Sequence, residues 1–363
     1  MKLITYFICN VFIFTTLTTD CHRREANIAT SIEASASVDD DIYPIVIDIR
    51  EAMRNKTDYK LSDIVDSITY ISIESSDEFI ASVNTNMIRF SRNYIVAEHF
   101  YGSGTLMCFD RSGKFIGQIA KKGRGPGEYN WISDVAIDDQ NDIVYVLSYG
   151  TMKIFKYSLQ GAFLGEINTL PLNADKIIVD PTGLLLVHFP NWRGNLEYSC
   201  LLLDSKGDTL DMLKNNIFYS HGDTRKAYQT EGIRYIYNDL MHIKSKGDTL
   251  LVVKNNRFIP KYVFDTGVKR SNMTISEYDE MISFRTINET DDNVFFQFQL
   301  DKRWYSAYYD KKSGKAFSVP SGDFSTQNRI TQLPSPKRRR VGNRLKPTED
   351  YDMLKSSSVS LSF

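Results

Sequence analysis

Short apolar or alternating runs recur along most of the chain, bounded by Gly, Asn, Asp or Ser. Clear examples are residues 94–100, 143–149, 184–189, 250–253 and 294–300, which are rich in β-branched and aromatic side chains. Runs of this length with a period near two predict β-strands. The pattern argues against helical repeats, because their apolar positions would follow a 3.6-residue period.

A strand-turn-strand unit follows each of these runs. Residues 107–117 closely parallel residues 154–165, and the same pattern returns at 201–207, 263–267 and 308–314. An Asp or Ser opens most of these turns and a Gly closes them, which is typical of tight hairpins. The turn-opening residues are 48, 46, 61 and 45 positions apart. Four short strands in about 45 residues is the period of a propeller blade.

The pattern therefore predicts an all-β fold, a six-bladed β-propeller of four-stranded antiparallel blades, over residues 42–330. Five repeats are visible, so the sixth blade either combines the strand near Tyr70 with C-terminal residues or stays incomplete. The 61-residue step predicts an insertion at 213–234. Residues 331–363, with the basic run 337–340, are expected to form a disordered or atypical tail.

The N-terminal residues 1–20 have the pattern of a secretory signal. A lysine precedes about 15 mostly apolar residues, which are too few to span a bilayer. Cys21 stands where a bacterial lipoprotein signal places its acylated cysteine, although Asp20 is not the usual small residue. Two interpretations of this segment are open: a signal followed by lipidation of Cys21, and an ordinary signal peptide without lipidation. Residues 21–41 are polar and small, as in a flexible tether.

Cys108 and Cys200 fall in predicted strands about two repeats apart. Strands of non-adjacent blades are too distant for a disulfide, so we expect two buried free thiols. The chain has 44 basic and 45 acidic residues, a balance that disfavours a nucleic-acid partner.

The segment Lys122-Gly-Arg-Gly-Pro-Gly-Glu-Tyr129, together with the strand pattern of 61–74, resembles the six-bladed NHL-like β-propeller lipoproteins of Bacteroides-type bacteria. The resemblance covers roughly residues 45–319 and implies an outer-membrane lipoprotein of the cell envelope. From the residues alone, the glycine-rich segment predicts a tight connection between the first two blades. The alternative is that this glycine-rich segment contacts a ligand directly. Its residues are Gly123, Gly125, Pro126, Gly127, Glu128 and Tyr129.

Propellers bind ligands mainly at one mouth of the central channel, where the loops between second and third strands converge with the connections between blades. Reading these loops from the repeats gives an aromatic and basic rim, which suits a sugar, a peptide or an acidic group. The candidate ligand-binding residues are His99, Tyr101, Tyr149, His188, Trp192, Arg193, Lys254, Arg303 and Trp304.

Sequence signatures of catalysis are absent: there is no Gly-x-Ser-x-Gly elbow and no His-Glu-x-x-His motif. We therefore expect no metal, no cofactor and a non-catalytic binding or scaffolding role. The expected partner is a glycan, a peptide or an envelope protein. The alternative is a metal-dependent, lactonase-like hydrolase or lyase.

Overall fold

The computed structural model describes most of the chain between residues 44 and 319 and three short C-terminal segments. The described residues are 44–57, 67–74, 83–84, 87–99, 102–168, 172–191, 195–215, 218, 233–244, 247–267, 282–300, 303–319, 340–341, 344–345 and 358–362. Within them, nearly all regular structure is strand. No helix in this part of the chain has the length and apolar character needed to cross a bilayer.

The first three sheets are four-stranded antiparallel meanders. The first contains β3 (Ile88–Phe90), β4 (Tyr94–Glu98), β5 (Leu106–Asp110) and β6 (Phe115–Ala120). The second contains β7 (Trp131–Asp138), β8 (Ile143–Tyr149), β9 (Lys153–Ser158) and β10 (Phe163–Ile167). The third contains β11 (Lys176–Val179), β12 (Leu185–His188), β13 (Tyr198–Leu203) and β14 (Thr209–Lys214).

The fourth and fifth sheets repeat the meander. The fourth contains β15 (Ile233–Tyr237), β16 (Leu240–Lys244), β17 (Thr249–Lys254) and β18 (Arg257–Asp265), with β1 (Ile45–Asp48) added parallel to β18. The fifth contains β19 (Ile282–Glu289), β20 (Asn293–Leu300), β21 (Arg303–Asp310) and β22 (Lys315–Val319). The expectation of an all-β fold of four-stranded antiparallel sheets is confirmed.

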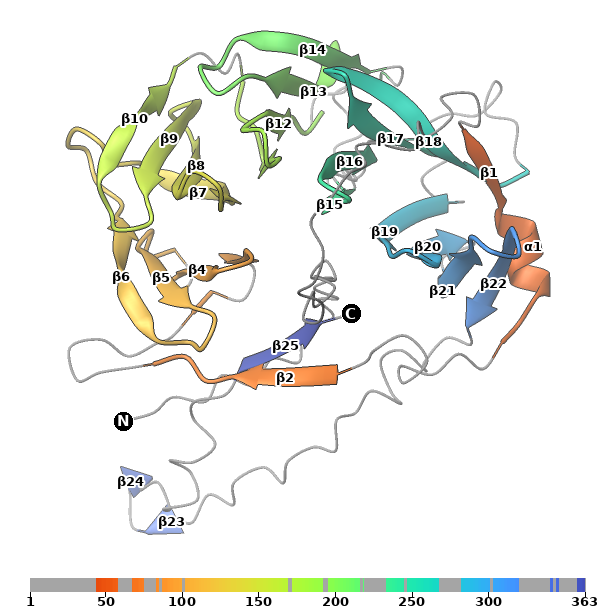
Figure 1. Cartoon of the computed structure of the whole chain (residues 1–363), viewed down its shortest axis with the longest axis horizontal. Helices are drawn as coiled ribbons and strands as arrows, with labels where there is room; N and C mark the ends of the chain where they lie inside the picture. Colours follow the sequence, from red (N-terminus) through yellow and green to blue (C-terminus); the bar gives the residue numbers. More distant parts are fainter. Residues whose placement is uncertain are drawn as a thin grey trace, which may run out of the picture.

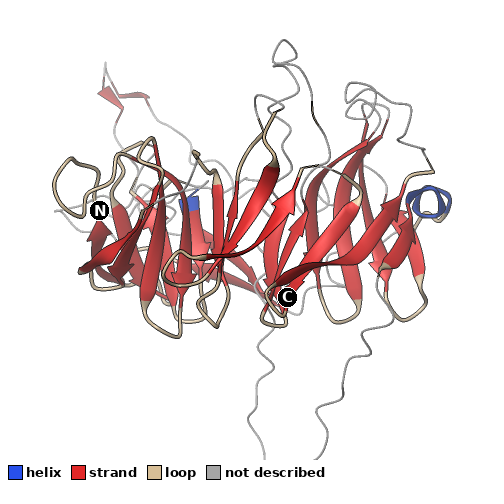
Figure 2. Ribbon diagram, turned by 90° about the horizontal axis from the view of Figure 1, so that it is seen from above, coloured by secondary structure: helices blue, strands red, loops and turns tan. Residues whose placement is uncertain are grey.

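The five sheets stand around a common centre, with the first strand of each sheet innermost and the fourth outermost (Figure 1). Seen edge on, the strands run between the two broad faces (Figure 2). Between the fifth and first sheets, β2 (Ser67–Ile71) pairs antiparallel with β25 (Ser358–Ser362). The ring is not closed by a sixth four-stranded sheet in the described residues.

The strand around Tyr70 thus pairs with C-terminal residues. Its partner β25 lies within residues 331–363, for which the sequence predicts a disordered or atypical tail. A second two-stranded pair, β23 (Arg340–Val341) with β24 (Arg344–Leu345), lies in the same stretch.

Hydrophobic cores lie between neighbouring sheets. Val96 and Val146 share a core between the first and second sheets, and Phe264 and Phe296 share one between the fourth and fifth. Inner strands are covered on both sides, so β12 is buried at all four positions. This explains why these strands appear in the sequence as continuous apolar runs rather than as alternating ones.

The hairpin turns have the predicted chemistry. The Asp110 carboxylate accepts hydrogen bonds from the backbone N–H groups of Ser112 at 2.8 Å and Lys114 at 3.0 Å. Its hydrogen bond from the Ser112 hydroxyl is the main reason that the Asp110 pKa is lowered. Gly113 has φ +87, and a Cβ there would lie 2.0 Å from the Ser72 carbonyl oxygen. Only glycine allows β2 to pack this closely.

One repeat was predicted incorrectly. The turn at 265–267 follows β18, the fourth strand, whereas the hairpin between the third and fourth strands is at Asn255 and Asn256. Both asparagines have positive φ, of 52° and 57°, as a two-residue type I′ turn requires. This hairpin contains neither Asp nor Gly, so the repeat pattern placed the predicted hairpin at the next polar turn, residues 265–267. Part of the 61-residue step is therefore an error of register.

An N-terminal clasp, residues 45–57, joins the outer edges of the fourth and fifth sheets. After β1 comes the helix α1 (Ile49–Arg54). Its N-cap is Asp48, whose side chain accepts hydrogen bonds from the Arg50 and Glu51 N–H groups. Thr57 then donates to the Ser318 carbonyl at 3.1 Å. Figure 1 shows α1 beside β22. The clasp covers edge strands that would otherwise expose unpaired backbone groups.

Both cysteines in the described part of the chain, Cys108 and Cys200, are buried free thiols, as expected. Burial raises the pKa of Cys108 to about 12 and also raises that of Cys200. Because the thiolate is the nucleophile, we expect neither thiol to react in the folded protein.

Candidate functional site

Strand alternation gives the ring two distinct faces. The crossover face carries the loops between second and third strands and the connections from each sheet to the next. The hairpin face carries the turns between first and second and between third and fourth strands. The predicted mouth corresponds to the crossover face.

A pocket of about 300 Å³ opens on the crossover face between the second and third sheets. This volume is at the lower end of the range for small-molecule sites. We call it the crossover pocket. Its lining residues are Trp131, Ile132, Ser133, Tyr149, Asn173, Ala174, Asp175, Lys176 and Pro190.

Two aromatic side chains dominate one wall of the crossover pocket. Trp131 begins β7 and pairs directly with Tyr149, the last residue of β8. They are 45% and 43% exposed, respectively, although side chains of this size usually bury most of their surface. The Lys122 ammonium lies over the Trp131 ring. Together these residues form an exposed aromatic surface next to a positive charge.

The opposite wall is polar and comes from the start of the third sheet. Asp175 accepts a 2.6 Å hydrogen bond from Nδ1 of the buried His188, which orients both groups. Asn173 accepts from the Gly150 N–H at 2.8 Å, so its oxygen is engaged and its amide NH₂ is the remaining donor. Next to them, Lys176 begins β11.

Three donors of the crossover pocket are unengaged. The Lys176 ammonium, the Ser133 hydroxyl and the Asn173 NH₂ group form no hydrogen bond or ion pair with any residue that the structure describes. Burial lowers the pKa of Lys176, and the nearby Asp134 only partly offsets this effect. The pocket therefore offers hydrogen-bond donors and a partly desolvated cation to a ligand.

An ion cluster beside the crossover pocket connects the innermost strands of four sheets. Asp134 on β7 is fully buried and pairs with Arg89 on β3 and with Arg234 on β15. It also accepts the backbone N–H of Ile177 on β11 at 3.0 Å. Burial opposes ionisation of Asp134, but the charges of Arg234, Arg89 and Lys176 and the Ile177 N–H together outweigh burial and lower its pKa to about 2. The cluster fixes the strands that carry Trp131 and Lys176.

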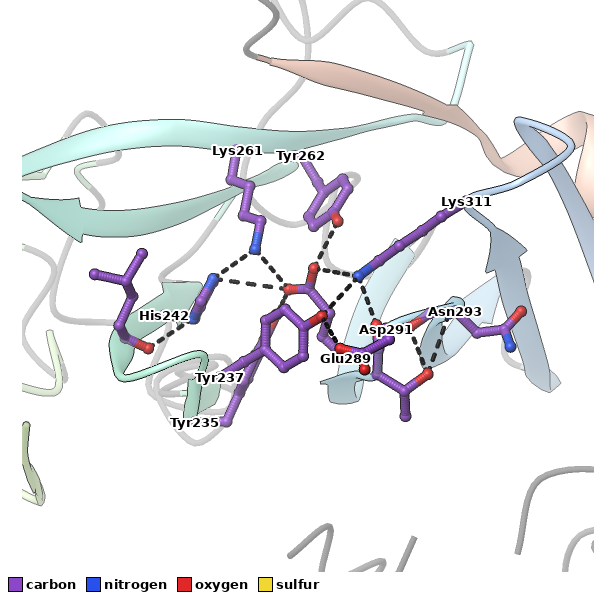
Figure 3. A network of polar contacts seen from close by, with 11 residues as sticks. Tyr235, Tyr237, His242, Lys261, Tyr262, Glu289, Asp291, Asn293 and Lys311 are labelled. Carbon is purple, nitrogen blue, oxygen red and sulfur yellow. Dashed lines mark hydrogen bonds and ion pairs between the residues drawn. The ribbon is translucent and has the colours of Figure 1, made fainter. Parts of the chain in front are cut away.

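A second buried network joins the fourth and fifth sheets near the hairpin face (Figure 3). The Glu289 carboxylate at the end of β19 accepts hydrogen bonds from Lys261, Lys311 and Tyr262, each at 2.8 Å. Burial would raise the pKa of Glu289, but the two ammonium groups lower it. One carboxylate thus binds two cations from separate elements.

His242 completes this network as a neutral acceptor. Its Nδ1 donates to the Leu240 carbonyl at 2.9 Å, and its Nε2 accepts from the Lys261 ammonium at 2.8 Å. The ring stacks on Tyr235 with centroids 4.7 Å apart. Burial, reinforced by the Lys261 charge, lowers the pKa of His242 to about 3.

The glycine-rich segment connects β6 to β7 on the crossover face. Gly123 donates to the Tyr129 carbonyl at 3.0 Å, and the Glu128 carboxylate accepts from the Gly125 N–H at 2.8 Å. Tyr129 is buried and its hydroxyl donates to the Gly104 carbonyl at 2.6 Å. Gly127, with φ +71, follows Pro126 and lies against Phe163. The segment positions Trp131 two residues after Tyr129.

The structure brings together only part of the predicted mouth. Tyr149 lines the crossover pocket and His188 supports it through Asp175. His99 lies in the equivalent loop of the first sheet, which approaches Trp131 at Gly102. Tyr101, Trp192, Arg193 and Cys21 lie outside the described residues.

The remaining predicted residues are elsewhere. Arg303 and Trp304 begin β21 on the crossover face, where the Trp304 ring packs under Arg285, but neither lines the crossover pocket. The placement of Lys254 is wrong. It ends β17 at the hairpin between the third and fourth strands, and therefore lies on the hairpin face. The register error in the fourth repeat caused this misplacement.

Trp131, Asp175 and Lys176 are not among the residues predicted from the sequence. The candidates came from the loops between second and third strands, whereas these three residues lie at or just before the starts of first strands, which are on the same face because strands alternate in direction. An exposed Trp directly after the glycine-rich connection was the available signal. No group of three or more potential metal ligands is found among the described residues.

Comparison with known proteins places the chain in a family. A family model described as "Domain of unknown function (DUF4934)" matches residues 44–356. The chain belongs to this DUF4934 family. No curated protein matches the sequence.

Two solved structures from Bacteroides match the chain. A Bacteroides fragilis NCTC 9343 protein named "Putative exported protein" is 22% identical with a TM-score of 0.60, over 80% of this chain and 84% of that one. A DUF4221 family member from Bacteroides vulgatus is 10% identical with a TM-score of 0.45, over 70% and 84% of the two chains. The first likeness shows a shared fold.

Proposed function

We propose that this DUF4934 protein is an exported binding protein of the cell envelope, which holds a small ligand in the crossover pocket without converting it chemically. The observation that carries the proposal is the combination of the exposed Trp131 and Tyr149 with three unengaged donors in one pocket. A few convergent polar groups beside aromatic surface are the usual composition of a ligand site. The Asp134 ion cluster fixes the inner strands of the second and third sheets, so the site is preorganised.

Export is supported by the N-terminal pattern and by the name of the Bacteroides fragilis neighbour, and anchoring by the position of Cys21 after the apolar stretch. We propose that residues 1–20 direct export and that Cys21 carries the lipid in the outer membrane. Fractionation of the producing bacterium tests the anchor: Cys21→Ala should move the protein from the membrane to the soluble fraction. Retention in the membrane would overturn lipidation.

We also propose that the full ring has six blades, with β2 and β25 as strands of the sixth. Apolar surface flanks their position on both sides. Ile71 packs against Ile95 and Phe109 of the first sheet. On the fifth sheet, Phe295 and Tyr308 form a cluster on the face opposite Phe296, because neighbouring strand residues alternate.

Removal of residues 358–362 tests this arrangement. The truncated chain should unfold at a lower temperature, because the pairing partner of β2 is lost. An unchanged melting temperature would contradict a structural role for β25.

Binding at the crossover pocket is tested by screening the full chain against glycan and peptide arrays. Trp131→Ala should abolish the binding that the wild-type protein shows. Trp304→Ala is the matched control, since Trp304 is exposed to a similar extent, 42%, and lies outside the pocket. Loss of binding in Trp304→Ala with retention in Trp131→Ala would move the site to the fifth sheet and refute the proposal.

A further inference from the structure

The donors of the crossover pocket specify a ligand rich in acceptors. Lys176, Ser133 and Asn173 all offer N–H or O–H groups, and none is engaged by a described residue. The Asn173 oxygen and the Asp175 carboxylate already accept hydrogen bonds. A ligand that only donates would therefore leave most of the pocket unsatisfied, whereas carboxylate and hydroxyl oxygens would satisfy it.

The charges around the crossover pocket favour an anion. The acidic groups nearest Lys176 are Asp134 and Asp175, and Asp134 also pairs with Arg89 and Arg234, so three cations face two carboxylates. Lys122, over the Trp131 ring, adds a second positive charge at the opposite wall. A ligand carboxylate would balance this excess of positive charge beside the partly desolvated Lys176 ammonium.

The aromatic wall sets the shape of the ligand. Trp131 and Tyr149 are direct cross-strand neighbours and expose a broad apolar surface at the edge of the pocket. A pyranose ring has an apolar face of C–H groups that packs on such a surface, while its edge carries hydroxyls that can accept hydrogen bonds. The pocket volume of about 300 Å³ suits one or two such rings.

We propose that the crossover pocket binds an acidic saccharide, with the carboxylate on Lys176, the ring on Trp131 and Tyr149, and hydroxyls on Ser133 and Asn173. This inference rests on the proposed binding function and names its ligand class.

Isothermal titration of the full chain with a galacturonic acid trisaccharide and with its methyl ester tests the proposal. The methyl ester removes the charge of each carboxyl group and adds one methyl group to it. The acid should bind about tenfold more tightly than the ester. Lys176→Met, which keeps the length of the side chain without its charge, should remove this difference. Trp131→Ala should weaken both probes, and Trp304→Ala neither.

The outcomes separate this inference from the proposed function. Equal affinity for acid and ester would overturn the acidic class and leave binding at the pocket intact. If neither trisaccharide binds, but a peptide or another array ligand binds in a Trp131-dependent manner, the saccharide class is wrong and the proposed function stands. If no ligand of any class depends on Trp131, both proposals fail.

Discussion

The His242 network makes the stability of the protein depend on pH in a calculable way. His242 has a folded pKa of about 3 against an ordinary value of 6.5. Between these values the unfolded chain binds a proton that the folded chain excludes. The contribution of neutral His242 to the free energy of unfolding is therefore fully present above about pH 6.5 and decreases as the pH falls toward 3.

The magnitude follows from the same two pKa values. Each pH unit below 6.5 costs about 1.4 kcal/mol, so acidification from pH 7 to pH 5 should remove about 2 kcal/mol from the free energy of unfolding. For a chain of this size, that loss lowers the melting temperature by about 4 °C. Glu289 adds little to the loss of stability between pH 7 and pH 5. Its pKa is lowered from 4.5, so its contribution to the free energy of unfolding is lost only at more acidic pH.

His242→Gln isolates the effect. The Gln amide oxygen replaces Nε2 as the acceptor for Lys261, but the side chain does not titrate. Urea unfolding followed by circular dichroism at pH 7 and pH 5 should show a pH-dependent loss about 2 kcal/mol smaller in the variant than in the wild-type protein. Identical losses in both proteins would refute the assignment of His242 as the buried neutral group.

Three further predictions concern the packing around the candidate site. Asp134→Asn should lower the free energy of unfolding by about 3–5 kcal/mol, because Arg89 and Arg234 lose their buried counter-charge; a loss below 1 kcal/mol in urea unfolding would contradict this. Tyr129→Phe should cost about 1–2 kcal/mol in guanidinium unfolding, since the buried Gly104 carbonyl loses its donor, and an unchanged midpoint would count against that contact. Cys108 should resist alkylation at pH 8 until the protein unfolds, as read by peptide mass spectrometry, and rapid labelling of the native protein would show that the thiol is accessible.

The periodicity of the sequence was sufficient to predict the all-β class, four of the five visible hairpins and the buried free cysteines. These features depend on local pattern: period-two apolar runs, Asp and Gly at turns, and the spacing of the repeats. The fourth hairpin was missed because Asn255 and Asn256 reach positive φ without glycine.

Only the tertiary structure decided which residues share a site. Asp134, Arg89 and Arg234 are separated by 45 and 100 positions in sequence and meet because the innermost strands of four sheets converge on one centre. Trp131 and Lys176 line one pocket because they begin adjacent inner strands on the same face. Side-chain alternation along one strand is encoded locally, whereas the packing of one sheet on the next is not. For this reason the sequence alone determined the strands of this protein, and the three-dimensional fold determined its site.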